Sequence, residues 1–76
     1  MNKVSVSYQD KAKGILRAEI KRRDLTYEDL AKLLAAKGVK DNARNLSNKI
    51  TRGAFTAGFF VMCLEAIGVH SLRLHD

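Results

Sequence analysis

Hydrophobic residues recur at intervals of three and four along most of this chain, which is the spacing of one buried face of a helix. The pattern predicts four helices, over residues 8–23, 27–37, from 41 or 42 to 52, and from 56 to 67. A residue with a short polar side chain, able to accept hydrogen bonds from the first turn, precedes each of them. The caps that we expect are Ser7, Thr26, Asp41 or Asn42, and Thr56.

The hydrophobic positions also predict which side of each helix is buried. In the first helix an apolar stripe runs from Ala12 to Ile20 and includes the aliphatic part of Glu19, while the opposite side is strongly basic. The fourth helix is apolar at almost every position from Phe59 to Ile67. Because such a helix must be covered around most of its circumference, we expect it to be the central helix of the core.

The period of the pattern changes at the two ends of the chain. Residues 3–8 and 69–76 alternate between apolar and polar side chains, which is typical of a half-buried strand. The expected fold is therefore mainly α, a compact domain of four helices with short terminal β-strands. This single domain, 1–76, divides into an N-terminal arm or strand (1–7), a helical core (8–68) and a C-terminal strand (69–76).

Two leucines of the expected C-terminal strand, Leu72 and Leu74, indicate a surface through which a homodimer could form. An isolated two-stranded ribbon is marginal unless it packs on something else, so the terminal strands could pair within one chain or between two. The tail could equally pack on the first helix of its own chain.

Composition limits the possible functions. A chain of 76 residues forms one small core with little room for a catalytic cavity, so we expect no enzyme. A single cysteine cannot form an internal disulfide and no secretion signal opens the sequence, which together favour the cytoplasm. The longest apolar stretch is far shorter than the roughly 20 residues of a membrane-spanning helix, so no membrane association is expected.

The sequence indicates no metal site and no cofactor. His70 and His75 lack further ligands at a metal-binding spacing, and the 5 glycines are too far apart for a phosphate-binding loop. Cys63 lies among apolar residues without a neighbouring base, as a small buried hydrophobe does. Binding of a macromolecule is the remaining class of function.

The charge and the order of the helices point to DNA. The chain has 14 Lys and Arg against 8 Asp and Glu, a net charge of +6, and basic residues gain affinity for a polyanion by displacing its counterions. A short helix followed by one with polar outward residues is the arrangement that inserts the second helix into the major groove. Asn, Arg and Lys are suited to hydrogen bonding with base edges. The base-contacting residues that we expect are Asn42, Arg44, Asn45, Asn48 and Lys49.

A second set of residues is expected to hold the DNA backbone. Basic residues end the first and third helices, and Tyr27 stands at the start of the second, where unpaired N–H groups favour an anion. Glu28 and Asp29 share that turn and would repel a phosphate on their own side. The phosphate-contacting residues that we expect are Lys21, Arg22, Arg23, Tyr27 and Arg52.

Three pieces of the chain carry a family resemblance: IKRRDLTYEDLAKLLAAKGV, NKITRG and CLEAIGV. They resemble the helix-turn-helix domain of phage-repressor-like (XRE/Cro-type) transcriptional regulators over residues 17–69. The resemblance implies a lambda-repressor-like fold and double-stranded DNA as the partner. It directs four residues of the third helix toward DNA, namely Arg44, Asn45, Asn48 and Lys49, with Arg52 near the backbone.

The sequence departs from that family at two places. Tyr27 stands where the family usually has Gln, and the connection AAKGVKDNA is longer than the family's tight turn. The chain is still more similar to a group of short bacterial proteins, which implies a bacterial source and no particular function.

Two other functions fit parts of the pattern. A module that binds a protein, such as an antitoxin or an adaptor, would use the acidic start of the second helix and an edge strand at residues 69–76. Sequence-independent binding of RNA or single strands would need exposed aromatic rings, for example at Phe55 and Tyr27. The spacing of Phe55, Phe59 and Phe60 in an apolar segment is more typical of a core.

Overall fold

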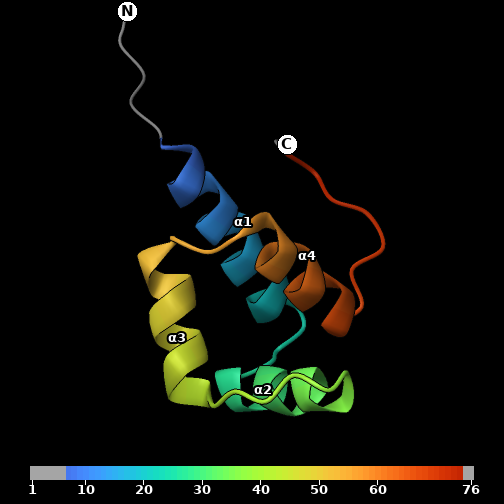
Figure 1. Ribbon diagram of the computed structural model, residues 1–76. Helices are drawn as coiled ribbons and strands as arrows, with labels where there is room; N and C mark the ends of the chain where they lie inside the picture. The colour runs from blue at the N-terminus through green and yellow to red at the C-terminus, as the bar shows by residue number, and fades with distance from the viewer. Residues whose placement is uncertain (1–6, 75–76) are drawn as a thin grey trace, which may run out of the picture.

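The computed structural model describes residues 7–74 and contains four helices in that range. They are α1 (Tyr8–Arg22), α2 (Tyr27–Ala36), α3 (Ala43–Arg52) and α4 (Ala57–Ala66). α1 and α4 lie side by side, α3 stands at one edge of the domain, and α2 crosses below them (Figure 1). The four predicted helices are confirmed, and their observed ends lie within about one residue of the expected ones.

The helices form a closed ring of contacts. α1 packs against α3 and α4, and α2 packs against the same two helices. No Cα atom of α1 lies within 8 Å of one in α2, and the same holds between α3 and α4. Each helix therefore has two neighbouring helices, and the core fills the middle of the ring.

Each of the four helices begins with a side-chain cap, as expected from the sequence. The cap accepts a hydrogen bond from a backbone N–H of the first turn, which has no carbonyl partner within the helix. Asn42 rather than Asp41 caps α3, since its Oδ1 lies 2.8 Å from the backbone N of Asn45. The other caps are Ser7, Thr26 and Thr56.

The core is made of aliphatic pairs spaced one helical turn apart. Such a spacing places both members on the same side of a helix. The pairs are Leu16 and Ile20 of α1, Leu30 and Leu34 of α2, Leu46 and Ile50 of α3, and Cys63 and Ile67 at α4, joined by Leu64.

α4 is not the central helix that its apolar sequence predicts. Val61 is 51% exposed, and Phe59 and Phe60 are only half-buried. The ring arrangement explains the difference, because two neighbours can cover only part of the circumference of any one helix. α4 is thus a peripheral helix with an apolar outer side.

Gly53 joins the end of α3 to the beginning of α1. Its φ of 72° is in the left-handed region that ends a helix, and a Cβ at this position would lie 3.4 Å from the backbone oxygen of Gln9. Lys13 Nζ donates a hydrogen bond to the Thr51 carbonyl at 3.2 Å. These contacts fix the C-terminal end of α3 against the first half of α1.

The expected C-terminal strand is wrong for residues 69–74, which contain no strand. A strand needs a second strand to satisfy its N–H and C=O groups, and none exists in the described part of the chain. The segment instead runs back beside the domain (Figure 1), with Leu72 packed against the core and Leu74 64% exposed. The N-terminal arm or strand falls mostly on residues 1–6, which lie outside the described residues, as do residues 75–76. Tyr8, which ended the alternating pattern, begins α1.

Candidate nucleic-acid interface

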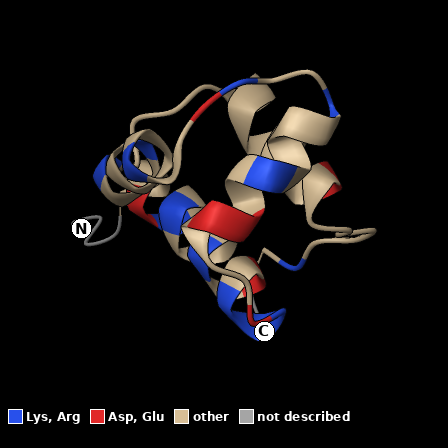
Figure 2. Ribbon diagram, turned by 90° about the horizontal axis from the view of Figure 1, so that it is seen from below, with Lys and Arg blue, Asp and Glu red and all other residues tan. Residues whose placement is uncertain are grey.

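α3 presents a row of polar side chains to solvent. Leu46 and Ile50 hold its inner side in the core. The helix contains no Asp or Glu, whereas α1 and α2 carry charges of both signs (Figure 2). Of the residues predicted to contact bases or the backbone from this region, five are exposed: Asn42, Arg44, Asn45, Asn48 and Arg52.

Asn42 differs from the other two asparagines because it is committed to the helix cap. Its Oδ1 accepts the Asn45 backbone N–H, and a bidentate contact with adenine would need that same oxygen. Asn45 and Asn48 are exposed and make no side-chain hydrogen bond within residues 7–74. The side chains that are free to pair with base edges are therefore those of Arg44, Asn45 and Asn48.

Lys49 points away from this row, toward α4. Its Nζ lies 4.8 Å from the centre of the Phe59 ring and 3.7 Å from Asp41 Oδ2. The side chain is 40% exposed. The ammonium group that the sequence assigned to a base is thus engaged by a carboxylate and an aromatic face.

The predicted basic cluster at the end of α1 is partly neutralised by Glu19, one of the buried residues of that helix. Arg22 Nη1 lies 3.3 Å from Glu19 Oε2, and Arg23 pairs with Glu19 Oε1 while also donating to the Glu19 carbonyl at 3.2 Å. Within the described residues Lys21 has no carboxylate oxygen within 4.0 Å. Lys21 is therefore the member of the cluster whose charge is available.

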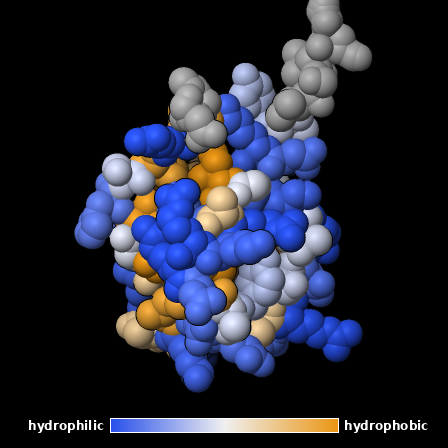
Figure 3. Space-filling model, turned by 180° about the vertical axis from the view of Figure 1, so that it is seen from behind, coloured by the Kyte–Doolittle hydropathy of each residue, from blue (hydrophilic) through white to orange (hydrophobic). Residues whose placement is uncertain are grey.

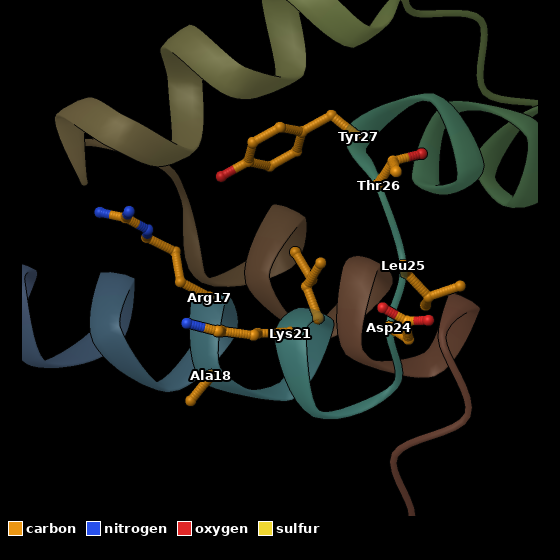
Figure 4. A pocket seen from close by; sticks show the side chains of 8 residues that line it. Arg17, Ala18, Lys21, Asp24, Leu25, Thr26 and Tyr27 are labelled. Carbon is orange, nitrogen blue, oxygen red and sulfur yellow. The ribbon is translucent and has the colours of Figure 1, made fainter.

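An open groove of about 520 Å³ lies between α1 and the start of α2. Arg17 and Lys21 enter it from neighbouring turns of α1, and the Tyr27 ring reaches from α2 toward Arg17 (Figure 4). Asp24 and Thr26 line the other end of this groove (Figure 4). Two cations and a phenolic hydroxyl facing one space are suited to hold a phosphate oxygen.

Arg17 was not among the expected phosphate contacts. The signal was present in the sequence, because residues four apart share one face of a helix and Lys21 is the i+4 neighbour of Arg17. The pairing of Glu19 with Arg22 and Arg23 follows the same rule, at i+3 and i+4.

The backbone at the start of α2 is occupied by its own capping box. Asp29 Oδ2 accepts the Thr26 backbone N–H at 2.9 Å, and Thr26 Oγ1 accepts the Asp29 N–H at 3.0 Å. Hydrogen bonding of the Asp29 carboxylate with the Thr26 backbone N–H, and then with the Thr26 side chain, lowers the pKa of the Asp29 carboxyl group. A phosphate at this end would meet a carboxylate, so the Tyr27 hydroxyl is better placed for a phosphate than the first N–H groups of α2.

The phenylalanines form a cluster with one another. The Phe55 ring centre lies 5.5 Å from that of Phe59 and 5.9 Å from that of Phe60, with which it is stacked. All three rings are half-buried and pack against the core, as does Tyr27. Neither Phe55 nor Tyr27 therefore offers the exposed ring that stacking on single-stranded bases requires.

Metal ions have no evident site in the described residues, where no group of three or more His, Cys, Asp or Glu side chains comes together. His70 is exposed, and His75 lies outside the described residues. Burial raises the pKa of the Cys63 thiol to about 11, against a smaller opposing effect of the Lys49 charge. Between residues 7 and 74 no helix has the length and apolar character to span a membrane.

No curated protein and no solved structure matches the chain. Residues 8–72, which include all four helices and the whole of the surface described above, match the family described as domain of unknown function DUF6471. The chain belongs to that family.

Proposed function

We propose that this protein binds double-stranded DNA with sequence specificity and acts as a small transcriptional regulator, with α3 as the recognition helix of a helix-turn-helix domain. The observation that carries the proposal is the acid-free outer face of α3, on which Arg44, Asn45 and Asn48 are exposed. A helix of this size fits the major groove, and these side chains pair with guanine and adenine edges.

The arrangement of α2 and α3 supports the same proposal. The two helices are consecutive, pack against each other and lie crosswise (Figure 1). α2 would rest across the edge of the groove while α3 enters it. The resemblance to phage-repressor-like regulators gives the same assignment of roles.

Phosphate binding is proposed for the groove between α1 and α2. Arg17, Lys21 and the Tyr27 hydroxyl would hold one stretch of backbone, and Arg52 at the end of α3 a second. Arg22 and Arg23 contribute less than the sequence suggests, because both guanidinium groups are paired with Glu19, whose carboxylate offsets one of their two charges. The protein would need neither a cofactor nor catalytic chemistry for this role, and it would act in the bacterial cytoplasm.

A homodimer is the proposed assembly. One module of this size covers about 600 to 1,000 Å² of DNA, and two copies reading two half-sites give the additional specificity that a regulator needs. Hydrophobic patches lie between hydrophilic side chains on the surface seen from behind (Figure 3). Val61 of α4 and Leu74 of the C-terminal segment are also exposed. Leu74, with Leu72 beside it, is the contact that we propose between the two copies.

The experiment is selection from a randomised duplex library, followed by titration of the selected duplex and a scrambled one at about 50 and about 200 mM salt. A selected sequence that contains a repeated half-site and stays preferred at the higher salt supports the proposal. Equal loss of binding to both duplexes at the higher salt would contradict the proposal, because the charge would then act only as a general attraction for polyanions.

An alternative function is a module that binds a protein, such as an antitoxin or adaptor. The exposed Val61 and Leu74 favour it, since exposed apolar side chains are suited to a protein partner. Recruitment through an edge strand has lost its basis for residues 69–74. The duplex titration separates the two functions, because a protein-binding module would show no preferred sequence.

A further inference from the structure

The backbones of α3 and α4 do not pack directly against each other. In the described residues no Cα atoms of the two helices come within 8 Å of each other, although both helices pack on α1 and α2. A recognition helix reads bases only if its side chains are held in a fixed orientation, and a displacement of about 1 Å weakens a bidentate contact. The question is what holds α3 on its open side.

One side chain crosses this gap. Lys49 lies in the C-terminal half of α3. Its Nζ lies over the ring of Phe59, in the first turn of α4, at 4.8 Å from the ring centre. The same Nζ lies 3.7 Å from Asp41 Oδ2, in the connection that leads into α3. The lysine thus touches the segment before its own helix and the helix after it.

The surroundings of Lys49 are unfavourable for a contact with DNA. Asp41 offsets its charge, and the Asp41 side chain is only 16% exposed and accepts the Asn42 N–H at 2.9 Å, so the carboxylate cannot easily turn away. To reach a base or a phosphate, Lys49 would have to give up both the carboxylate and the aromatic face. Arg44 and Asn48, exposed on the same helix, have no such partners among residues 7–74.

We propose that Lys49 is a positioning residue, which fixes the orientation of α3 by bridging Asp41 and Phe59, and that it does not contact DNA. This inference rests on the proposed DNA-binding function. It assigns to Lys49 and Phe59 a role in sequence discrimination although neither touches a base. It also assigns the direct reading of bases to Arg44, Asn45 and Asn48.

The first test uses the protein without DNA. The ε protons of Lys49 lie over an aromatic face, so ring current shifts their NMR resonance upfield. We expect this shift in the unaltered protein and its loss in Phe59→Leu, which keeps an apolar side chain but removes the ring. A resonance at the position of a solvent-exposed lysine in the unaltered protein would overturn the inference.

The second test measures affinity for the selected and the scrambled duplex as a function of salt. Lys49→Met keeps the length of the side chain and removes its charge. We expect it to lower the ratio of the two affinities by about 3- to 10-fold, the equivalent of one lost cation–aromatic contact, and to leave the salt dependence unchanged. Lys49→Arg should restore the ratio, because the guanidinium also stacks on aromatic rings.

Further variants separate positioning from contact. Phe59→Leu should lower the ratio as Lys49→Met does, and the double variant should be no worse than either, since both remove one interaction. Lys32→Met, an exposed lysine of α2, is the charge-matched control and should leave the ratio unchanged. If Phe59→Leu does not fold, the comparison of Lys49→Met with Lys49→Arg carries the test.

If Lys49→Met reduces the slope of log affinity against log salt by about 0.9, Lys49 binds a phosphate and the inference is overturned. If the unaltered protein prefers no duplex, the proposed DNA-binding function fails, and the proton shift alone decides whether Lys49 bridges α3 and α4.

Discussion

Lys13 donates a hydrogen bond from its Nζ to the backbone carbonyl of Thr51, at 3.2 Å, and so connects the first half of α1 with the last turn of α3. The last carbonyl groups of a helix have no partner within it and carry the negative end of its dipole. A lysine at this place satisfies one of them and adds a favourable charge. The end of the proposed recognition helix is thus held by a residue 38 positions away in the chain.

We expect Lys13→Met to lower the free energy of unfolding by about 0.5–1.5 kcal/mol, the usual value of one such hydrogen bond. Urea denaturation followed by circular dichroism measures it. Lys11→Met, which removes the same charge from the same turn, is the control and should change stability less. Equal effects of the two substitutions would mean that the bond to Thr51 contributes nothing.

Gly53 and Gly14 predict opposite effects of the same substitution. Gly53→Ala should destabilise the fold by about 1 kcal/mol or more, because its φ of 72° lies in the left-handed region, which is strained for a residue with a Cβ. Gly14→Ala should stabilise it by about 0.5–1 kcal/mol, since Gly14 lies inside α1 and nothing is within 4 Å of its Cβ position. Thermal unfolding of both variants checks the pair, and a change of the same sign in both would contradict this account.

The capping box of α2 predicts a pH dependence of stability. Hydrogen bonds from the Thr26 backbone N–H and side chain lower the pKa of Asp29 below its ordinary value of 3.8 in the folded state. The stability that this carboxylate contributes is therefore present above pH 3.8 and is lost as the pH falls through the lowered pKa. Asp29→Asn should remove that part of the acid-induced loss, measured as melting temperature against pH. Glu28→Gln, from the same turn, is the control and should leave the profile of the unaltered protein in place.

The groove between α1 and α2 predicts different roles for two arginines of α1. Arg17→Ala should weaken binding to the selected and the scrambled duplex equally. It should also reduce the slope of log affinity against log salt by about 0.9, as expected for one lost phosphate contact. Arg22→Ala should change the slope much less, because Glu19 already pairs with that guanidinium. Asn48→Ala should instead lower the binding free energy by about 1–3 kcal/mol for the selected duplex alone. Fluorescence anisotropy titrations at several salt concentrations distinguish the three, and identical behaviour would exclude base reading by α3.

The helices could be predicted from the sequence because the interactions that begin and end them are local. Thr26 and Asp29, three residues apart, form the capping box within one turn. The hydrogen bond that Asn42 accepts from the Asn45 N–H also spans three residues. The outward face of α3 followed from helical spacing alone. These features do not depend on how distant parts of the chain come together.

The errors concern contacts between distant segments. The apolar sequence of α4 could not reveal that only two neighbours cover it, and alternation at residues 69–74 could not supply a strand to pair with. The contact of Lys49 with Phe59 was likewise not readable in the sequence, because Phe59 belongs to another helix. The Glu19 pairs are an exception, since i+3 and i+4 spacing to Arg22 and Arg23 was readable in the sequence.

The ring of helix contacts makes the two halves of the chain depend on each other. The first half contains α1 and α2, the second contains α3 and α4, and within neither half do the two helix backbones come within 8 Å of each other, Cα to Cα. Every pair of helices with Cα atoms within 8 Å of each other joins one half to the other, and Lys49 over Phe59 is a side-chain contact within the second half. A fragment ending in the connection before Asn42 would therefore expose both apolar stripes with nothing to cover them, and the chain must be folded as a whole before α3 can be held in place.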